Sequence, residues 1–248
     1  MPSELPNYAV IIPARFESTR LPGKPLINLL GVPMVVRTYR QCIQACPPER
    51  VYVATDDLRI EAACRAHGIN VLMTSSDCLT GTDRVAECAD QLTADVFINV
   101  QGDEPVFNPE DLTRFLDCLS SHPGEILNGF CVIDSEAMYH SSSTPKVVMR
   151  PDGRLLYMSR APIPGNKSHS FACAWRQVCV YAFPRRALED FASHPAKTPL
   201  ENLEDIEILR FLELGWDVRM IELSAQSVAV DNPEDVARAE AVIREREL

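Results

Sequence analysis

The sequence predicts an α/β protein with a Rossmann-like, mostly parallel sheet and helices on both of its faces. Short apolar runs alternate with segments whose apolar residues recur at helical spacing, and the runs themselves carry no polar face. Strands that are buried on both sides of a parallel sheet are apolar throughout in this way. With 248 residues, 46% of them hydrophobic, the chain is long enough to bury a large core.

The first half of the chain contains four apolar runs that we expect to form the parallel part of the sheet. The run at residues 9–12 is bounded by Pro13, and the run at 96–100 is the clearest strand signal in the chain. Prolines and glycines mark the ends of the helices between the runs. A polar loop is expected at residues 74–84. The strands expected in this half are residues 9–12, 51–54, 70–73 and 96–100, and the helices are residues 33–45, 60–66 and 85–91.

The second half of the chain predicts a β-rich lobe inserted into this sheet. Its strand-like runs are separated by stretches rich in Ser, Pro, Asn and Gly, which are typical of irregular connections. We expect one domain, residues 1–248, with a nucleotide-binding half at about 8–125, the inserted lobe at about 126–200, and a return to the core at 201–248. The elements expected here are helices at 109–119, 202–214 and 235–247 and strands at 129–133, 146–149, 155–158, 177–183 and 218–223.

Composition argues against several kinds of partner. The formal net charge of −11 disfavours a general nucleic-acid or acidic-membrane binder, because a surface of that sign repels phosphate groups. No apolar run is long enough to cross a bilayer. A signal peptide begins with a basic segment, whereas the start of this chain is acidic. The nine cysteines include no Cys-x-x-Cys pair and mostly lie in apolar or helical patterns. We therefore expect a cytoplasmic protein with reduced thiols and neither a nucleic-acid nor a membrane partner.

The loop at residues 13–25 gathers three basic side chains, Arg15, Arg20 and Lys24, directly after the first apolar run. Loops at the carboxyl ends of parallel strands form the edge where nucleotides bind, and a dense group of cations suits a polyanion. The loop is not a Walker A motif, because Pro25 follows the Gly-Lys pair, and it is not a dinucleotide fingerprint. A solvated basic turn is the alternative interpretation of the same residues.

Two aspartates stand at the ends of apolar runs and are candidate metal ligands. Asp103 follows the run at residues 96–100 after a glycine, and Asp231 ends a shorter run at 228–230. Mg²⁺ prefers one or two carboxylates together with substrate phosphates, so the pair predicts a magnesium site at this edge of the sheet. Helix capping is the alternative for both, and it is stronger for Asp231 because Pro233 follows it at the start of a helix.

Eight sequence blocks, in register from about residue 8 to residue 245, carry the pattern of a known family. They are IIPARFESTRLPGKPL, VYVATDD, VLMTSSDCLTGTDRVAE, VFINVQGDEP, STPKVV, LYMSRAPIP, ENLEDIEILR and AVDNPEDV. The most specific are PAR-x-x-S-x-R-LPGKP and the apolar strand that runs into QGDEP. Together they resemble the 3-deoxy-manno-octulosonate (Kdo) cytidylyltransferases, also called CMP-Kdo synthetases. The resemblance implies a GT-A-like nucleotidyltransferase fold whose inserted lobe binds the sugar and forms a homodimer, and residues 178–183 are a candidate for its interface.

The resemblance also implies a reaction. An Mg²⁺-dependent enzyme would transfer CMP from CTP to the anomeric hydroxyl of a 3-deoxy-2-ulosonic acid, Kdo or a close relative, and release pyrophosphate, which activates the sugar for surface lipopolysaccharide. Such a displacement needs placed cations and a metal against phosphate charge more than covalent help. Lys24, Arg15 and Asp103 would then be catalytic, and Asp103 and Asp231 would hold the metal. The residues implied for CTP are Arg15, Ser18, Arg20, Lys24, Thr82, Arg84 and Gln101, with a surface ion pair as the alternative for Arg20.

The acceptor side of the site follows from the same resemblance. Arg160 has the planar fork that suits a sugar carboxylate. Gln177 and Ile208 depart from the family pattern, which has histidine and glutamine at these positions, and Ile208 can neither donate nor accept a hydrogen bond. We therefore expect an acceptor related to Kdo that is altered at a hydroxyl near Ile208. The residues implied for the sugar are Gln101, Arg160, Gln177, Tyr181 and Glu207.

Two other functions remain open at this point. A nucleotidyltransferase for a sugar phosphate would not need Arg160 as a carboxylate clamp, and it would act on a phosphorylated sugar. A catalytically idle homologue would bind nucleotide for regulation or assembly. The presence of both the basic loop and the two strand-end aspartates disfavours the idle homologue.

Overall fold

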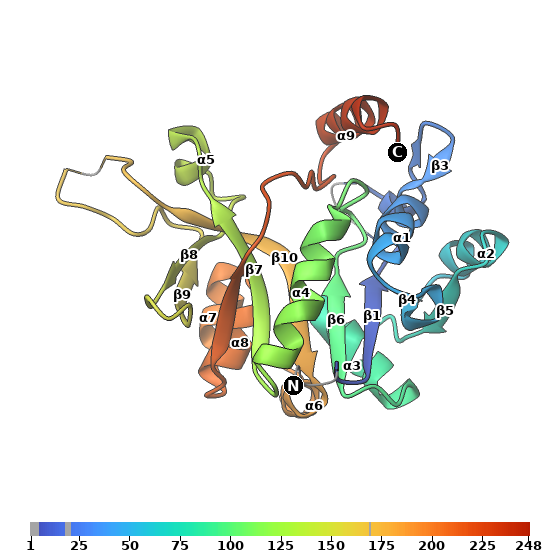
Figure 1. Ribbon diagram of the computed structural model, residues 1–248, viewed down its shortest axis with the longest axis horizontal. Helices are drawn as coiled ribbons and strands as arrows, with labels where there is room; N and C mark the ends of the chain where they lie inside the picture. The colour runs from blue at the N-terminus through green and yellow to red at the C-terminus, as the bar shows by residue number, and fades with distance from the viewer. Residues whose placement is uncertain (1–4, 18–20, 169) are drawn as a thin grey trace.

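A computed structural model describes residues 5–17, 21–168 and 170–248, and it is organised around one nine-stranded sheet (Figure 1). The main path of the sheet has the order β11-β7-β10-β6-β1-β4-β5, and β8 and β9 form a ribbon that branches from β10. A small separate hairpin joins β2 to β3. The strands are β1 Tyr8–Pro13, β2 Asn28–Leu29, β3 Val32–Pro33, β4 Val51–Thr55, β5 Asn70–Met73, β6 Val96–Val100, β7 Ile126–Val132, β8 Lys146–Met149, β9 Leu155–Ser159, β10 Trp175–Pro184 and β11 Val218–Glu222.

The predicted α/β class and its mostly parallel sheet are confirmed. β1 pairs in parallel with β4 and β6, and β4 pairs in parallel with β5. β10 lies antiparallel between β6 and β7, while β11 is parallel to β7. Every residue of β1 is buried, as expected for a strand covered on both faces.

Helices cover both faces of the sheet, and alternate residues of β1 contact different layers. Val10 and Ile12 pack in the core that holds α1 and α4, whereas Ile11 packs in the core that holds α3, α6 and α8. Figure 1 shows α4 on the near face and α3 behind the sheet. The helices are α1 Met34–Ala45, α2 Leu58–Ala66, α3 Gly81–Gln91, α4 Pro109–Ser121, α5 Glu136–His140, α6 Arg185–Ala192, α7 Pro199–Glu204, α8 Ile208–Glu213 and α9 Pro233–Glu245, with 3₁₀ turns η1 Lys24–Leu26 and η2 Pro48–Arg50.

Two of the predicted helical regions differ in the structure. The single helix expected at 202–214 is wrong, because Asp205 adopts a left-handed φ of 52° and separates α7 from α8. The polar loop expected at 74–84 ends earlier than predicted, since α3 begins at Gly81. Thr80 caps that helix and forms a capping box with Asp83. Both changes alter which side chains reach the edge of the sheet.

The predicted lobe is smaller than expected. β7 and β10 belong to the main sheet, and the part that projects from it consists of α5, the β8–β9 ribbon and the long loops around them (Figure 1). The expectation that residues 178–183 form part of a dimer interface is wrong. It lies inside the sheet as part of β10, paired with β6 on one side and β7 on the other.

The described residues contain free thiols and helices of at most 13 residues. All nine cysteines lie in the described residues, and each is a free thiol. Within the ranges that the structure describes, no helix combines the length and the apolar character that crossing a membrane requires.

Candidate active site

A polar cleft opens at the carboxyl ends of β1 and β6. These strands are parallel neighbours, so the loops that follow them meet at the same edge of the sheet. The first turn of α3, the 3₁₀ turn η1, the segment before α9 and the connection around α7 and α8 complete the walls. The residues of the predicted site that line this cleft are Arg15, Lys24, Arg84, Gln101, Asp103, Glu207 and Asp231.

Lys24 joins the two predicted metal ligands. Its Nζ donates to Asp103 Oδ2 at 2.6 Å and to Asp231 Oδ1 at 3.1 Å. Burial lowers the pKa of the Lys24 ammonium, but the two carboxylates, Asp103 before Asp231, outweigh burial and raise that pKa. Lys24 is therefore a fixed positive charge in the cleft. The two aspartates that hold it lie 79 and 207 positions further along the chain.

The turn that carries Asp103 requires a close approach of two strand ends. A Cβ at Gly102 would lie 2.7 Å from the carbonyl oxygen of Pro13, which leaves no room for any other residue. Val230 N donates to the carbonyl oxygen of Asp103 at 2.9 Å, and this bond brings the segment of Asp231 alongside. The glycine thus allows Asp103 to lie beside the end of β1, and the bond from Val230 N brings Asp231 to the same place.

The two aspartates fit a hard divalent cation that shares its shell with a substrate. Asp103 and Asp231 converge on one ammonium, so their carboxylates are close enough to bind a common ion. Among the described residues no group of three or more His, Cys, Asp or Glu side chains forms a metal site. Two carboxylates completed by phosphate oxygens are the usual ligand set of Mg²⁺, whereas a site made of protein alone would need more donors.

Glu104 is a buried carboxyl that sequence reasoning did not single out. Its side chain directly follows Asp103, is 7% exposed, and leaves Oε2 without a hydrogen-bond partner in the described structure. Burial, and then the negative charge of Asp103, raise the pKa of Glu104 from its ordinary 4.5 to about 8. The acidic pair in the QGDEP block was the only available signal, and it does not say which carboxyl faces the cleft.

We expect Glu104→Gln to stabilise the metal-free protein, and to do so more at high pH. The native state holds the Glu104 proton up to about pH 8, whereas the unfolded state releases it near 4.5. Glu104 therefore lowers the free energy of unfolding as pH rises across this interval. Thermal melting in EDTA should give the variant a gain of about 5 °C at pH 8.5 and almost none at pH 5. An equal Tm difference at both pH values would contradict this assignment.

The residues predicted for the nucleotide occupy different depths of the cleft. Arg15 is exposed at its rim, and Gln101 packs against the first turn of α3. Arg84 is buried and directs its guanidinium toward Thr74, the carbonyl of Ser75 and the Asp56 carboxylate. Thr82 is fully buried and does not line the cleft. Ser18 and Arg20 lie outside the described residues.

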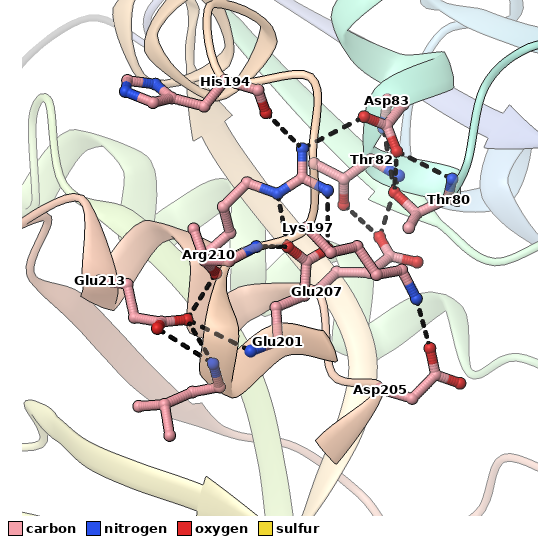
Figure 2. Close-up of polar contacts among 12 residues, drawn as sticks. Thr80, Thr82, Asp83, His194, Lys197, Glu201, Asp205, Glu207, Arg210 and Glu213 are labelled. Atoms are coloured by element: carbon pink, nitrogen blue, oxygen red, sulfur yellow. Dashed lines mark hydrogen bonds and ion pairs between the residues drawn. The ribbon is translucent and has the colours of Figure 1, made fainter. Parts of the chain in front are cut away.

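Glu207 reaches the cleft but is also bound to the first turn of α3. Its carboxylate accepts hydrogen bonds from Thr82 N at 2.9 Å and from the Thr82 hydroxyl (Figure 2). It also accepts one from Gly81 N at 3.2 Å. Burial raises the pKa of Glu207 despite these bonds, which lower it. The carboxylate thus stabilises the amino-terminal end of α3, where negative charge is favourable, and fixes this helix to α8.

The other residues predicted for the sugar do not line this cleft. Gln177 is buried, and its Nε2 donates to Asn128 Oδ1 at 3.0 Å and to the Tyr181 hydroxyl at 3.2 Å. Ile208 is fully buried in the core on the α3 side of the sheet. The expectation of an altered sugar hydroxyl near Ile208 is therefore wrong, because this side chain packs in the protein interior.

Arg160 is oriented by backbone carbonyls. Nη1 donates to Ser142 O and Nη2 to Asp205 O, each at 2.9 Å, and Nε donates to Glu204 O. The Glu204 carboxylate in turn accepts from Arg160 N at 2.8 Å and from the Ser159 hydroxyl at 2.6 Å. The planar fork that suggested a carboxylate clamp thus joins the β8–β9 ribbon to the turn between α7 and α8.

Sequence reasoning missed two charged residues in the cleft wall, Lys197 and Asp205. It also missed Arg210, which is fully buried and pairs with Glu201 through Nε at 2.6 Å and Nη2 at 2.7 Å (Figure 2). Nη1 of Arg210 reaches Asp83 in the first turn of α3 at 3.3 Å. The spacing of these residues resembles that of any charged helix face, so their contacts are visible only in three dimensions.

Comparisons with known proteins identify the proteins that this chain is similar to. A family model described as Cytidylyltransferase matches residues 9–221. A 3-deoxy-manno-octulosonate cytidylyltransferase of Escherichia coli is 36% identical over 234 residues, which cover 94% of this chain and 95% of the relative. An 8-amino-3,8-dideoxy-manno-octulosonate cytidylyltransferase of Shewanella oneidensis is 36% identical and covers 94% of this chain and 97% of its own. A solved structure of CMP:2-keto-3-deoxy-manno-octonic acid synthetase complexed with CTP has a TM-score of 0.90 at 34% identity, covering 97% of this chain and 99% of that one.

Proposed function

The chain belongs to the cytidylyltransferase family, among the 3-deoxy-manno-octulosonate cytidylyltransferases, and we propose that it transfers CMP from CTP to 3-deoxy-manno-octulosonate or a close relative. The observation that carries the proposal is the convergence of Lys24, Asp103 and Asp231 at the carboxyl edge of the sheet. A nucleoside triphosphate that binds together with a metal ion would bring phosphate oxygens to the Lys24 ammonium and a cation to the two carboxylates. The anomeric hydroxyl would lose its proton, its oxygen would bond to the α-phosphorus, and the bond from that phosphorus to pyrophosphate would break.

Each residue of the cleft has a proposed role in the CMP transfer that follows from its position. Lys24 gives two of its three N–H donors to the aspartates, so the third remains for a phosphate oxygen. Arg15 is exposed at the rim of the cleft, and it would meet the outer phosphates. Gln101 lies between the first turn of α3 and the turn of Asp103, where nucleotide and sugar would meet. The contribution of the chain is thus positioning and fixed charge.

We propose Mg²⁺ as the metal, held by Asp103 and Asp231. When bound, it would neutralise phosphate charge and lower the pKa of the attacking hydroxyl. We also retain the homodimer and the cytoplasmic location as proposals. Because residues 178–183 are paired inside the sheet, a dimer would use another surface. Leu156 on the projecting lobe and Val132 at the end of β7 are exposed apolar candidates.

Pyrophosphate release tests the function directly. With CTP, Mg²⁺ and the acceptor, we expect turnover that UTP supports far less well. The acceptors should include 3-deoxy-manno-octulosonate, its 8-amino-8-deoxy relative and a sugar phosphate, because Gln177 departs from the family pattern and one relative is named for the amino sugar. If only the sugar phosphate supported turnover, the protein would instead be a nucleotidyltransferase for a sugar phosphate. If CTP raised the Tm but no sugar released pyrophosphate, the idle homologue would replace the proposal.

A further inference from the structure

The loop at residues 13–25 turns back on itself at Phe16 and Gly23, and we call this pair the loop neck. Gly23 N donates to the carbonyl oxygen of Phe16 at 3.0 Å. Gly23 has a left-handed φ of 67°, and a Cβ at this position would lie 3.1 Å from Cε2 of the Phe16 ring. Glycine therefore suits both the turn and the close approach of the ring.

Two cations that line the cleft flank the loop neck. Arg15 directly precedes Phe16, and Lys24 directly follows Gly23 and begins the 3₁₀ turn η1. Leu26 N donates to the carbonyl oxygen of Gly23 at 2.8 Å, which fixes the turn on that side. Because the loop neck joins residues 16 and 23, it also fixes the backbone of Arg15 relative to that of Lys24.

Arg59, in the first turn of α2, covers the ring of the loop neck. Its guanidinium carbon lies 3.3 Å from the centre of the Phe16 ring, which is a cation–π contact. The Asp57 carboxylate orients this guanidinium, because Nε and Nη2 of Arg59 donate to its two oxygens at 3.0 and 2.6 Å. Asp57 is fixed in turn, since its side chain caps α2. Arg59 itself does not line the cleft.

We propose that Arg59 is a positioning residue for the phosphates of CTP, and that it acts by holding the Phe16 ring in the loop neck. The inference rests on the proposed function, since that function requires a triphosphate beside Arg15 and Lys24. When the loop neck opens, these two cations lose their relative placement. The apparent affinity for the triphosphate then falls in proportion to the fraction of molecules in which the neck is closed.

The charges of Arg59 and Asp57 offset each other beside the ring. The side-chain hydrogen bond from Arg59 lowers the pKa of Asp57 against the effect of burial, so this carboxylate is ionised at neutral pH. The Arg59 side chain is 61% exposed, and exposed charges are screened over about 8 Å at physiological salt. The direct contact with the ring is therefore the path by which Arg59 acts on the loop.

Calorimetric titrations of CTP and CMP in Mg²⁺ test this role, because CMP lacks the outer phosphates. Phe16→Leu keeps an apolar side chain against the core and should raise the Kd for CTP about 10-fold, as for a neck closed in about a tenth of the molecules. Arg59→Met should raise it about 3- to 5-fold, the loss expected for a cation–π contact. The Kd for CMP should change less than about twofold in both variants. Arg59→Lys should restore part of the affinity for CTP, since lysine keeps the charge but not the planar fork.

The double variant tells the proposed path from a direct effect of charge. Adding Arg59→Met to Phe16→Leu should weaken CTP binding little further, because Arg59 then has no ring to hold. A direct effect on the phosphates would instead add to that of Phe16→Leu. Arg65→Met is the matched control, since Arg65 lies on the same helix, is also 61% exposed and pairs with Glu61. It should leave both dissociation constants unchanged.

Three results would overturn the assignment while CTP binding by the wild type stands. They are a wild-type affinity for CTP in Arg59→Met, equal losses for CTP and CMP, and additive effects in the double variant. Thermal melting checks that each variant is folded. The titrations need no acceptor, so they remain decisive if no sugar acid is turned over. A wild type that binds no CTP would overturn the proposed function, and the assignment with it.

Discussion

Asp103→Asn is expected to lower kcat at least about 1000-fold, with the fold intact. The substitution keeps the shape of the side chain but removes the charge that faces Lys24 Nζ at 2.6 Å. Asparagine offers one neutral oxygen where the ammonium of Lys24 and the proposed divalent cation would both require an anion. Because Asp103 caps no helix and Lys24 keeps Asp231 as a partner, the fold should remain intact in the variant. The large effect should therefore fall on turnover rather than on Tm.

The measurement is pyrophosphate release at saturating CTP and acceptor across a range of Mg²⁺ concentrations. Asp152→Asn is the matched control, because Asp152 is an exposed partner of Arg150 away from the cleft and should leave turnover unchanged. EDTA should abolish the activity of the wild type. An Asp103→Asn variant that retains a tenth of the wild-type rate would show that this carboxylate is not needed for transfer.

Arg210→Met is expected to be the most destabilising substitution considered, at about 3–5 kcal/mol of the free energy of unfolding. Arg210 is fully buried, Glu201 is 1% exposed, and two hydrogen bonds join them. Without the guanidinium, the Glu201 carboxylate would be buried with no cation, and Asp83 would lose a partner in the first turn of α3. The side chain also lies over the ring of Phe191 at 3.7 Å, a packing contact that methionine replaces only in part.

Urea unfolding and thermal melting both measure this loss, which should lower Tm by about 10 °C. Arg244→Met provides the control, since its exposed pair with Glu240 on α9 should contribute at most about 0.5 kcal/mol. The double variant Arg210→Met with Glu201→Gln should recover part of the loss, because no unpaired charge remains at Glu201. A Tm of the single variant within about 2 °C of the wild type would contradict this account.

The sheet could be predicted well because burial of both faces leaves a direct trace in the sequence. The run at 96–100 was predicted with the bounds of β6, in which every residue is buried. Residues 70–73 were predicted with the bounds of β5, although this strand lies at the end of the sheet order and is only partly buried. Boundaries failed where a local hydrogen bond decided them. Thr80 caps α3 earlier than the apolar pattern begins, and the left-handed Asp205 divides a helix that the pattern presents as continuous.

The sequence by itself determined the fold class and the edge of the sheet where Arg15, Lys24, Asp103 and Asp231 meet. For Arg15, Lys24 and Asp103 it could do so because the loops that follow the parallel strands β1 and β6 share one edge of the sheet. Asp231 follows no strand in the structure, and the hydrogen bond from Val230 N to the carbonyl oxygen of Asp103 brings it to the same edge. Only the tertiary structure decided which polar groups pair. Ion pairs and hydrogen bonds join segments far apart in the chain, as between Lys24 and Asp231, and their geometry depends on how helices pack. That packing directs Arg160 to backbone carbonyls and places the guanidinium of Arg59 over the Phe16 ring.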